Sequence, residues 1–395
     1  MSPLTISSYT LTNALGRGNN ASHSALFEGR SGLRPCDLED VGLKTWIGRV
    51  DGLEAIALPE NLSAYDCRNN RLAYLALQQD GFSESVDKAI SQYSAERIGI
   101  FIGTSTSGIA TTEQAYLHKN PTTGQLRADY EPEKTHNVFS STSFPRAFLG
   151  LRGPALAIST ACSSSAKVFA AAHRYIESGL CDAAVVGGVD SLCMTTLYGF
   201  NSLDLISEAP CRPWDIERQG INIGEAAGFA LLEKTDAAST GPRLLGYGES
   251  SDAYHMSTPH PQGAGAVLAM QQALDRAGVT PDDIDYINLH GTATRANDLA
   301  EDKAVVQCFG NRVSCSSTKG FLGHTLGAAG ITEAIISLLC LNSELIPKNL
   351  QTENPDPELH ANVTLTTERR KLNYALTNSF GFGGNNCSLL FGRPV

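Results

Sequence analysis

Long hydrophobic runs are missing from this 395-residue sequence. Its longest apolar stretch lies within Ala334–Leu341, far short of the ~20 residues that a membrane-spanning helix needs. The amino terminus shows neither a basic segment nor an apolar one, so no secretory signal is visible. Cysteine is sparse, at 10 residues without a Cys-x-x-Cys pair, which argues against a disulfide scaffold or a cysteine-rich metal site. We therefore expect no membrane span and a reducing, cytoplasmic compartment.

Positive charge is also in short supply. Lys and Arg number 30 against 41 Asp and Glu, a formal net charge of −11. This balance argues against a nucleic-acid-binding surface, and any acidic partner must dock on a local basic patch. Hydrophobic residues make up 42% of the chain and charged residues 18%, which is enough apolar content to exclude disorder.

What the chain does have is a repeated alternation of buried strands and helices. We expect strands where short aliphatic runs precede glycine or small-residue turns, at Ile98–Gly103, Ala155–Ser159, Ala183–Gly187, Gly228–Glu233, Ile284–Leu289, Val313–Ser316 and Cys387–Phe391. The 3-4-3 spacing of apolar residues predicts a helix over Ala264–Ala277 that ends at Gly278. Such alternation is typical of an α/β protein whose sheets are covered on both faces.

No proline-rich or serine-rich linker divides the chain. A polar, turn-prone seam at residues 235–242 separates an N-terminal part, residues 1–240, from a C-terminal part, residues 241–395. Each part contains a strand that ends in chemically capable residues, at Cys162 in the first and His290 in the second. This pattern predicts two related halves whose strand ends meet.

Cys162 follows a buried strand directly and precedes a helix that is apolar nearly all round. The unpaired N–H groups and partial positive charge of a helix N-terminus stabilise a thiolate, so we expect a lowered pKa for this thiol. On local context alone, an inert buried cysteine is the alternative reading.

His290 ends the strand of the C-terminal half, beside a glycine turn. This is where α/β sheets place active-site groups, although a structural histidine fits the local pattern as well. Thr292 and Thr294 in the same turn either bind a ligand or cap the turn.

A further strand leads to Lys319, a glycine turn and His324, and then to a small-residue helix that carries Glu333. Lys319 and Glu333 are candidates for a buried ion pair. Near the C-terminus, the segment at residues 378–386 places glycines around two aromatic residues. Such a segment frees backbone N–H groups for an oxyanion, or it is a plain glycine-rich turn.

Four motifs together resemble one family. They are TACSSS around Cys162, HGTxT…ND…E around His290, TKGFLGHTLGAAG around His324 and NSFGFGG near the C-terminus. In this order and over nearly the whole chain, they resemble the β-ketoacyl-[acyl carrier protein] synthases, in their elongating Cys-His-His form. The resemblance implies a thiolase-like five-layered αβαβα fold of two related halves.

The resemblance also implies a decarboxylative Claisen condensation. Cys162 would hold the growing acyl chain as a thioester. His290 and His324 would hydrogen-bond the thioester carbonyl of the malonyl carrier while carbon dioxide leaves, and the backbone N–H groups of Cys162 and Phe382 would form the oxyanion hole. Lys319, tied to Glu333, would position these catalytic groups.

Substrate contacts follow from the same resemblance. Thr292 and Thr294 match positions that contact phosphopantetheine, Phe382 matches a gating phenylalanine, and Ile109 falls where the acyl pocket is lined. No metal and no resident cofactor is implied, because the phosphopantetheine arrives on the acyl carrier protein.

The expected partner is therefore an acyl carrier protein, which is itself acidic. Arg68, Arg71 and Arg212 resemble the family's carrier-docking positions, with solvated surface arginines as the alternative. The sequence departs from the family at Arg295, where proline is common, and at a GGNN loop in place of GGTN.

These departures leave the metabolic role open. The chain elongates fatty acids, or it works in polyene or polyketide synthesis, as a homodimer or as a heterodimer with a chain-length-factor-like partner. A thiolase is a further alternative, but it needs a second late cysteine. Cys387, the late candidate, sits inside an apolar strand-like run.

Overall fold

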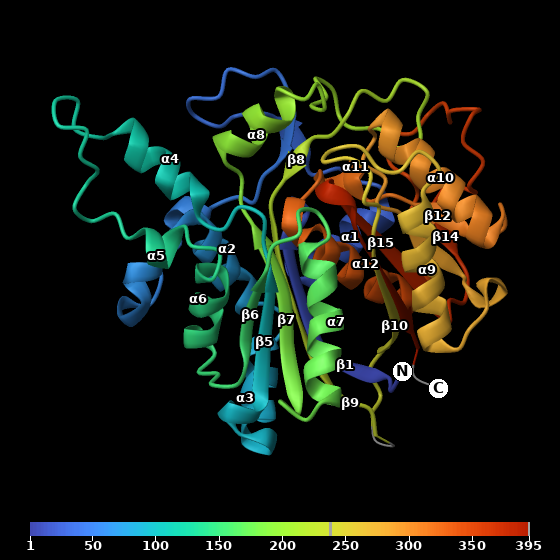
Figure 1. The fold of residues 1–395 in the computed structure, drawn as a ribbon, viewed down its shortest axis with the longest axis horizontal. Helices are drawn as coiled ribbons and strands as arrows, with labels where there is room; N and C mark the ends of the chain where they lie inside the picture. The colour runs from blue at the N-terminus through green and yellow to red at the C-terminus, as the bar shows by residue number, and fades with distance from the viewer. Residues whose placement is uncertain (237–238, 394–395) are drawn as a thin grey trace.

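The computed structural model describes residues 1–236 and 239–393, and it is built on two copies of one strand pattern (Figure 1). The first copy has the spatial order β1-β9-β7-β5-β6 and the second the order β10-β16-β15-β11-β12. The strands of the first copy are β1 (Leu4–Asn13), β5 (Ile98–Gly103), β6 (Ala155–Ile158), β7 (Ala183–Asp190) and β9 (Ala226–Lys234). Those of the second are β10 (Arg243–Ser251), β11 (Tyr286–Asn288), β12 (Ser314–Ser316), β15 (Tyr374–Gly381) and β16 (Asn385–Gly392).

Both copies also share their strand directions. In each, the first two pairings in the spatial order are antiparallel and the last two are parallel. The first strands of the two copies, β1 and β10, pair briefly at Leu4–Leu244 and Thr5–Arg243, which joins the copies into one continuous sheet. The expectation of two related halves is therefore confirmed. The seam falls between β9 and β10, and its residues 237 and 238 lie outside the described residues.

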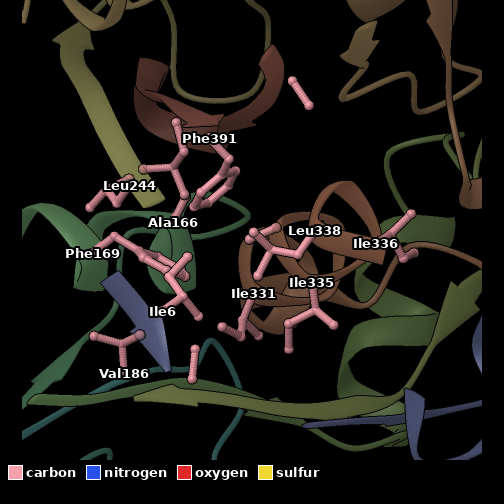
Figure 2. Packing of buried hydrophobic residues seen from close by; sticks show 14 of the residues in the cluster. Ile6, Ala166, Phe169, Val186, Leu244, Ile331, Ile335, Ile336, Leu338 and Phe391 are labelled. Atoms are coloured by element: carbon pink, nitrogen blue, oxygen red, sulfur yellow. The ribbon is translucent and has the colours of Figure 1, made fainter. Parts of the chain in front are cut away.

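Two helices fill the space between the halves. They are α7 (Ser164–Glu177), which follows β6, and α12 (Ala329–Ser343), which follows β12. Ala166 and Phe169 from α7 share one buried cluster with Ile331 and Ile335 from α12, and Phe391 of β16 closes it (Figure 2). The helices approach closely because Gly330 has no side chain: a Cβ there would lie 2.3 Å from the backbone nitrogen of Ala166.

The outer faces of the sheet carry the remaining layers. In the N-terminal half the outer helices are α2 (Arg68–Leu77), α3 (Phe82–Tyr93) and α6 (Ser140–Phe148), and in the C-terminal half they are α9 (Ala264–Ala277) and α10 (Arg295–Phe309). Strand side chains alternate between the layers: Leu389 and Phe391 face the central helices, whereas Leu390 faces α9 and α10. The result is the predicted order of helices, sheet, helices, sheet and helices.

Shorter elements complete the chain. They are β2 (Gly16–Arg17), α1 (Asn19–Glu28), β3 (Leu33–Pro35), β4 (Trp46–Gly48), α4 (Ile109–Leu117), α5 (Pro132–Thr135), α8 (Met194–Asn201), β8 (Ile223–Gly224), α11 (Lys319–Leu322), β13 (Leu345–Ile346), β14 (Glu368–Arg369), and the 3-10 helices η1 (Leu53–Ala55), η2 (Glu60–Tyr65), η3 (Ala95–Arg97), η4 (Pro281–Asp283), η5 (Leu326–Ala328) and η6 (Phe382–Gly384).

One helical segment in the described part of the chain, Leu326–Ser343, has the length and composition of a membrane span. It consists of η5 and α12, and 89% of it is buried inside the protein. Its apolar composition is explained by its place in the central layer, where it meets protein on all sides.

Candidate active site

The sharp bend after β6 presents Cys162 at the start of α7. Ala161 takes a left-handed conformation there, with φ of 54°, and the Ser164 hydroxyl stabilises the bend by accepting the N–H of Thr160 at 2.9 Å. The side chain of Cys162 is buried, with 6% exposure. The bend thus holds the thiol at the point where the two halves meet.

His324 lies against this thiol, with its Nε2 3.0 Å from the Sγ of Cys162. Its other ring nitrogen, Nδ1, accepts the backbone N–H of Leu326 at 3.2 Å. Because Nδ1 is an acceptor in the neutral ring, the proton of the imidazole resides on Nε2. The ring therefore presents an N–H donor to the site.

His290, which follows β11, presents the same kind of donor. The Lys319 ammonium lies 3.5 Å from Nδ1 of His290, so that nitrogen faces a cation and acts as the acceptor. The rings of His290 and His324 stand nearly perpendicular, with centroids 5.4 Å apart. Two imidazole N–H groups thus converge beside Cys162.

Lys319 is held in place behind the histidines. Its Nζ donates to the carbonyl oxygen of His290 and to Oε1 of Glu333, the latter at 2.5 Å, and both side chains of this ion pair are buried. Burial raises the pKa of Glu333 to about 7, against the lowering effect of the neighbouring ammonium. The predicted ion pair is present, and it fixes the backbone and ring of His290.

Burial dominates the protonation of the site. It holds the pKa values of His290 and His324 well below their usual range, assisted by the charge of Lys319, so both rings are neutral at pH 7. Burial likewise raises the pKa of Cys162 to about 11, although Lys319 and the N–H of Phe382 lower it. The expectation of a lowered thiol pKa is therefore wrong: loss of solvation outweighs the nearby ammonium and the N–H of Phe382.

The thiol and both imidazoles open into a cavity of about 900 Å³, which includes a part open to solvent. Phe382 lines it and lies against Phe200, with ring centroids 5.5 Å apart. Thr292 and Thr294 line it too, and their hydroxyls are 2.8 Å apart. These residues place an aromatic pair and two hydroxyls along the route to the thiol.

The loop after β15 supplies an N–H to the nucleophile. The backbone N–H of Phe382 hydrogen-bonds the Cys162 thiol. The approach requires glycine at position 381, because a Cβ there would lie 3.2 Å from the backbone nitrogen of Cys162 and 2.7 Å from the carbonyl oxygen of Thr160. The backbone N–H groups of Cys162 and Phe382 thus lie close together, as an oxyanion hole requires.

Four other predicted site residues do not line this cavity. Ile109 begins α4, outside the residues that line it. Arg68 is largely buried and pairs with Glu225 and Glu54, Arg71 pairs with Asp66, and Arg212 pairs with Glu217. The acyl-pocket and docking roles of these residues stay predictions.

Several positioning residues were missed by the sequence interpretation. Glu301 accepts the backbone N–H groups of His290 and Gly291 at 2.7 and 2.8 Å, and the amide of Asn378 at 3.2 Å. Asp190, at the end of β7, accepts the N–H groups of Ser105 and Gly327 from the two halves. The sequence signal for Asp190 is an acidic residue that ends an apolar run, and the signal for Glu301 is its place at the end of the HGTxT…ND…E motif.

The ligand atoms of Cys162, His290 and His324 lie within 4.8 Å of one another, close enough for a metal ion to bind all three. A metal needs a lone pair from each ligand. The hydrogen bonds at Nδ1 place an N–H on the inner nitrogen of both rings instead. The chemistry of the trio therefore fits an anionic oxygen better than a cation.

A buried thiol, two neutral N–H donors and paired backbone N–H groups define a cysteine acyltransferase that stabilises oxyanions. The sequence matches the family descriptions "Beta-ketoacyl synthase, N-terminal domain" over residues 69–238 and "Beta-ketoacyl synthase, C-terminal domain" over residues 243–353. The chain belongs to the β-ketoacyl synthase family, a family of acyltransferases, and the predicted resemblance is confirmed.

Individual relatives cover nearly the whole chain. The 3-oxoacyl-[acyl-carrier-protein] synthase 2 of Vibrio cholerae is 34% identical over 97% of both chains, and that of Rhizobium meliloti is 38% identical over 75% of this chain and 74% of its own. Among solved structures, a ketosynthase (ApeO) in complex with its chain length factor (ApeC) from Xenorhabdus doucetiae is 38% identical. It matches with a TM-score of 0.90 over 100% of this chain and 98% of its own. The ishigamide ketosynthase/chain length factor matches at 25% identity and a TM-score of 0.88, over 100% of both chains.

Proposed function

We propose that this protein is a β-ketoacyl-[acyl carrier protein] synthase that condenses malonyl carrier with an acyl group held on Cys162. The observation that carries the proposal is the pair of neutral imidazole N–H groups beside a buried thiol. Such donors stabilise an enolate oxygen in a site where water is scarce.

In the first half-reaction, the sulfur of Cys162 attacks the thioester carbonyl of an acyl carrier. The carbonyl oxygen becomes an oxyanion between the backbone N–H groups of Cys162 and Phe382. The C–S bond to the carrier breaks, and the thiol proton leaves with the carrier's sulfur. The raised pKa of Cys162 keeps the resting group a thiol, so the step transfers the proton as the bonds exchange.

In the second half-reaction, malonyl carrier binds with its thioester carbonyl oxygen against the Nε2–H groups of His290 and His324. The carboxylate leaves as carbon dioxide, and its bonding electrons form the enolate that the two N–H groups stabilise. The enolate carbon attacks the acyl thioester, the bond from the acyl carbon to the sulfur of Cys162 breaks, and the departing thiolate takes a proton from solvent to restore the thiol. Lys319 and Glu333 keep the rings oriented throughout.

The proposed partner is an acyl carrier protein, whose phosphopantetheine passes Thr292 and Thr294. No metal or resident cofactor enters these steps, and the protein works in the cytoplasm on neither nucleic acid nor membrane.

A second subunit would pair with β6. This strand lies at the edge of the sheet, and all its residues are partly exposed.

A second candidate is a catalytic subunit of a polyene or polyketide system, paired with a chain-length-factor-like protein. The 38% identity to ApeO, which was solved with its chain length factor, favours a heterodimer of this kind. Fatty-acid elongation as a homodimer is supported by the relatives named 3-oxoacyl-[acyl-carrier-protein] synthase 2. A thiolase is disfavoured because Cys387 is buried within β16, away from the trio.

Intact-mass analysis with a panel of acyl carriers tests the reaction. Wild-type protein should gain the mass of the acyl group, and Cys162→Ala should not. Retention of the mass gain by Cys162→Ala would exclude this nucleophile. The chain length that loads fastest, and the molar mass of the purified protein in solution, separate the two candidates.

A further inference from the structure

Beside the mouth of the active-site cavity lies a second hollow with three arginines in its wall, Arg212, Arg218 and Arg295. Its volume is about 780 Å³, including the part open to solvent. The two spaces are neighbours, because Thr294 lines the cavity and the next residue, Arg295, lines this arginine hollow. A ligand that enters the cavity past Thr294 therefore passes the hollow.

Two of the three arginines have carboxylate partners. Arg212 pairs with the exposed Glu217 at 3.1 Å. Arg218 is 1% exposed; its Nη1 donates to Asp356 at 2.6 Å, while its Nε has no hydrogen-bond acceptor and lies 3.5 Å from a carboxylate oxygen of Asp298. A buried guanidinium thus borders the hollow with one N–H group unsatisfied.

Arg295 is the member that forms no ion pair with a described carboxylate, although its charge also acts on the carboxylate of Asp356 from farther away. Among residues 1–236 and 239–393, no carboxylate lies within 4.0 Å of its guanidinium, which donates a long hydrogen bond of 3.4 Å to the carbonyl oxygen of Ile216. Its side chain is exposed at the rim. The arginine without an ion-pair partner therefore stands at the open end of the hollow.

The position of Arg295 in α10 is unfavourable for the helix itself. It is the first helical residue, after Thr294, and a cation there opposes the helix dipole. Proline would suit the position better, since its missing N–H costs nothing at a helix start. A bound phosphate makes a cation at this position favourable, because the phosphate accepts charge-assisted hydrogen bonds from both the guanidinium and the N–H groups at the helix start.

We propose that the arginine hollow binds the phosphate of the carrier protein's phosphopantetheine arm, with Arg295 as its main ligand and Arg212 as the second. The proposal rests on the proposed function, since it concerns the same donor. The phosphodiester is the ionised group of the arm and stands at its outer end, so it stays at the mouth while the thioester reaches Cys162. It also offers an acidic carrier an attractive contact on a chain with a net charge of −11.

The test compares two small acyl donors that differ only in the phosphate, acyl-4′-phosphopantetheine and acyl-pantetheine. Acylation of Cys162 is followed by intact mass, and kcat/KM is measured for each donor. We expect wild type to prefer the phosphorylated donor by roughly tenfold, the scale of one or two exposed charge-assisted contacts. Arg295→Gln should bring that ratio towards one, and Arg295→Lys should keep part of it.

Arg312→Gln is the matched control, because it removes the same charge from an exposed arginine that pairs with Asp282 elsewhere. It should keep the wild-type ratio. A wild-type ratio near one, or a ratio that Arg295→Gln leaves unchanged, overturns the proposal. Acyl-CoA in a parallel arm distinguishes a carrier-type phosphate from a nucleotide diphosphate, and a marked preference for acyl-CoA would overturn the assignment to a carrier.

Binding titrations of non-acylated 4′-phosphopantetheine and pantetheine separate this proposal from the proposed function. If no donor acylates the protein but phosphopantetheine still binds more tightly than pantetheine through Arg295, the condensation chemistry is wrong and the phosphate site stands. If acylation proceeds and the phosphate has no effect on either rate or binding, the condensation stands and the phosphate site is wrong.

Discussion

Replacing His324 with alanine separates the two half-reactions. In the structure the Nε2–H of His324 points at Sγ of Cys162 from 3.0 Å, while Nδ1 is occupied by the N–H of Leu326. The ring therefore has no free lone pair towards the thiol, and it cannot take the thiol proton. We expect His324→Ala to retain acylation of Cys162 and to lose decarboxylation of malonyl carrier.

The size of the loss follows from the donor that is removed. One hydrogen-bond donor to a developing oxyanion in a buried site contributes about 10²–10³ in rate, or roughly 2.7–4 kcal/mol. The variant also leaves the Leu326 N–H without its acceptor, which costs about 1–3 kcal/mol of stability. Folding must therefore be checked by thermal unfolding beside the rates. His324→Gln restores an N–H donor on a flexible side chain, and we expect it to recover part of the decarboxylation rate.

The assay measures each half-reaction separately by mass. Acyl transfer is read as the mass gain of the protein, and decarboxylation with condensation as the conversion of malonyl carrier to β-ketoacyl carrier on protein loaded beforehand. If acylation and decarboxylation fall by the same factor in His324→Ala, the ring acts as the base for the thiol and the tautomer argument fails. Unchanged decarboxylation would refute the enolate role.

Three further predictions concern the surroundings of the trio. Phe382→Ala keeps its backbone N–H, so we expect acylation to persist with weaker discrimination between long and short acyl donors; a competition assay that finds acylation abolished would contradict this. Lys319→Met leaves Glu333 buried without its cation, at a cost of about 3–5 kcal/mol. The pKa of Glu333 is about 7 with Lys319 present, and loss of the ammonium that lowers it raises the pKa further. Protonation of Glu333 relieves the cost at low pH, so Tm should fall more at pH 8 than at pH 6, and an equal fall would count against this reasoning. Arg68→Ala strands the buried Glu225, so urea unfolding should show a loss of about 3–5 kcal/mol, whereas lower carrier affinity with unchanged stability would make Arg68 a docking residue.

The halves of the molecule were predictable because their signals are local. The aliphatic runs before Cys162 and before His290 predicted the ends of β6 and β11 to within one or two residues, and the helix over Ala264–Ala277 has the predicted bounds. Each of these depends on a few neighbouring residues whose periodicity and glycine turns are visible in the chain.

The electrostatic details were not predictable in this way. The docking role that the resemblance implies for Arg68 and Arg71 stays a prediction, but their carboxylate partners were not foreseen: the buried Glu225 lies 157 positions from Arg68 in the chain. The pKa of Cys162 is raised, whereas the sequence predicted a lowered value, because the thiol is buried only when both halves pack over it. Charge pairing and desolvation depend on residues that are distant in the sequence, and a local sequence pattern carries no information about those residues.

The sequence by itself indicated the candidate reacting groups and the order of the elements that carry them. It contains a cysteine and a histidine that each follow a strand and a second histidine after a glycine turn, with glycines where the backbone must pass closely, because residue type and local conformation are properties of short segments. Only the tertiary structure decided the protonation of those groups. The inner N–H of each imidazole depends on what its outer nitrogen meets: Leu326 for one ring and Lys319 for the other. The Leu326 contact is local to its own turn, but Lys319 meets His290, 29 positions away in the chain, only when the segment after β12 packs beside the end of β11.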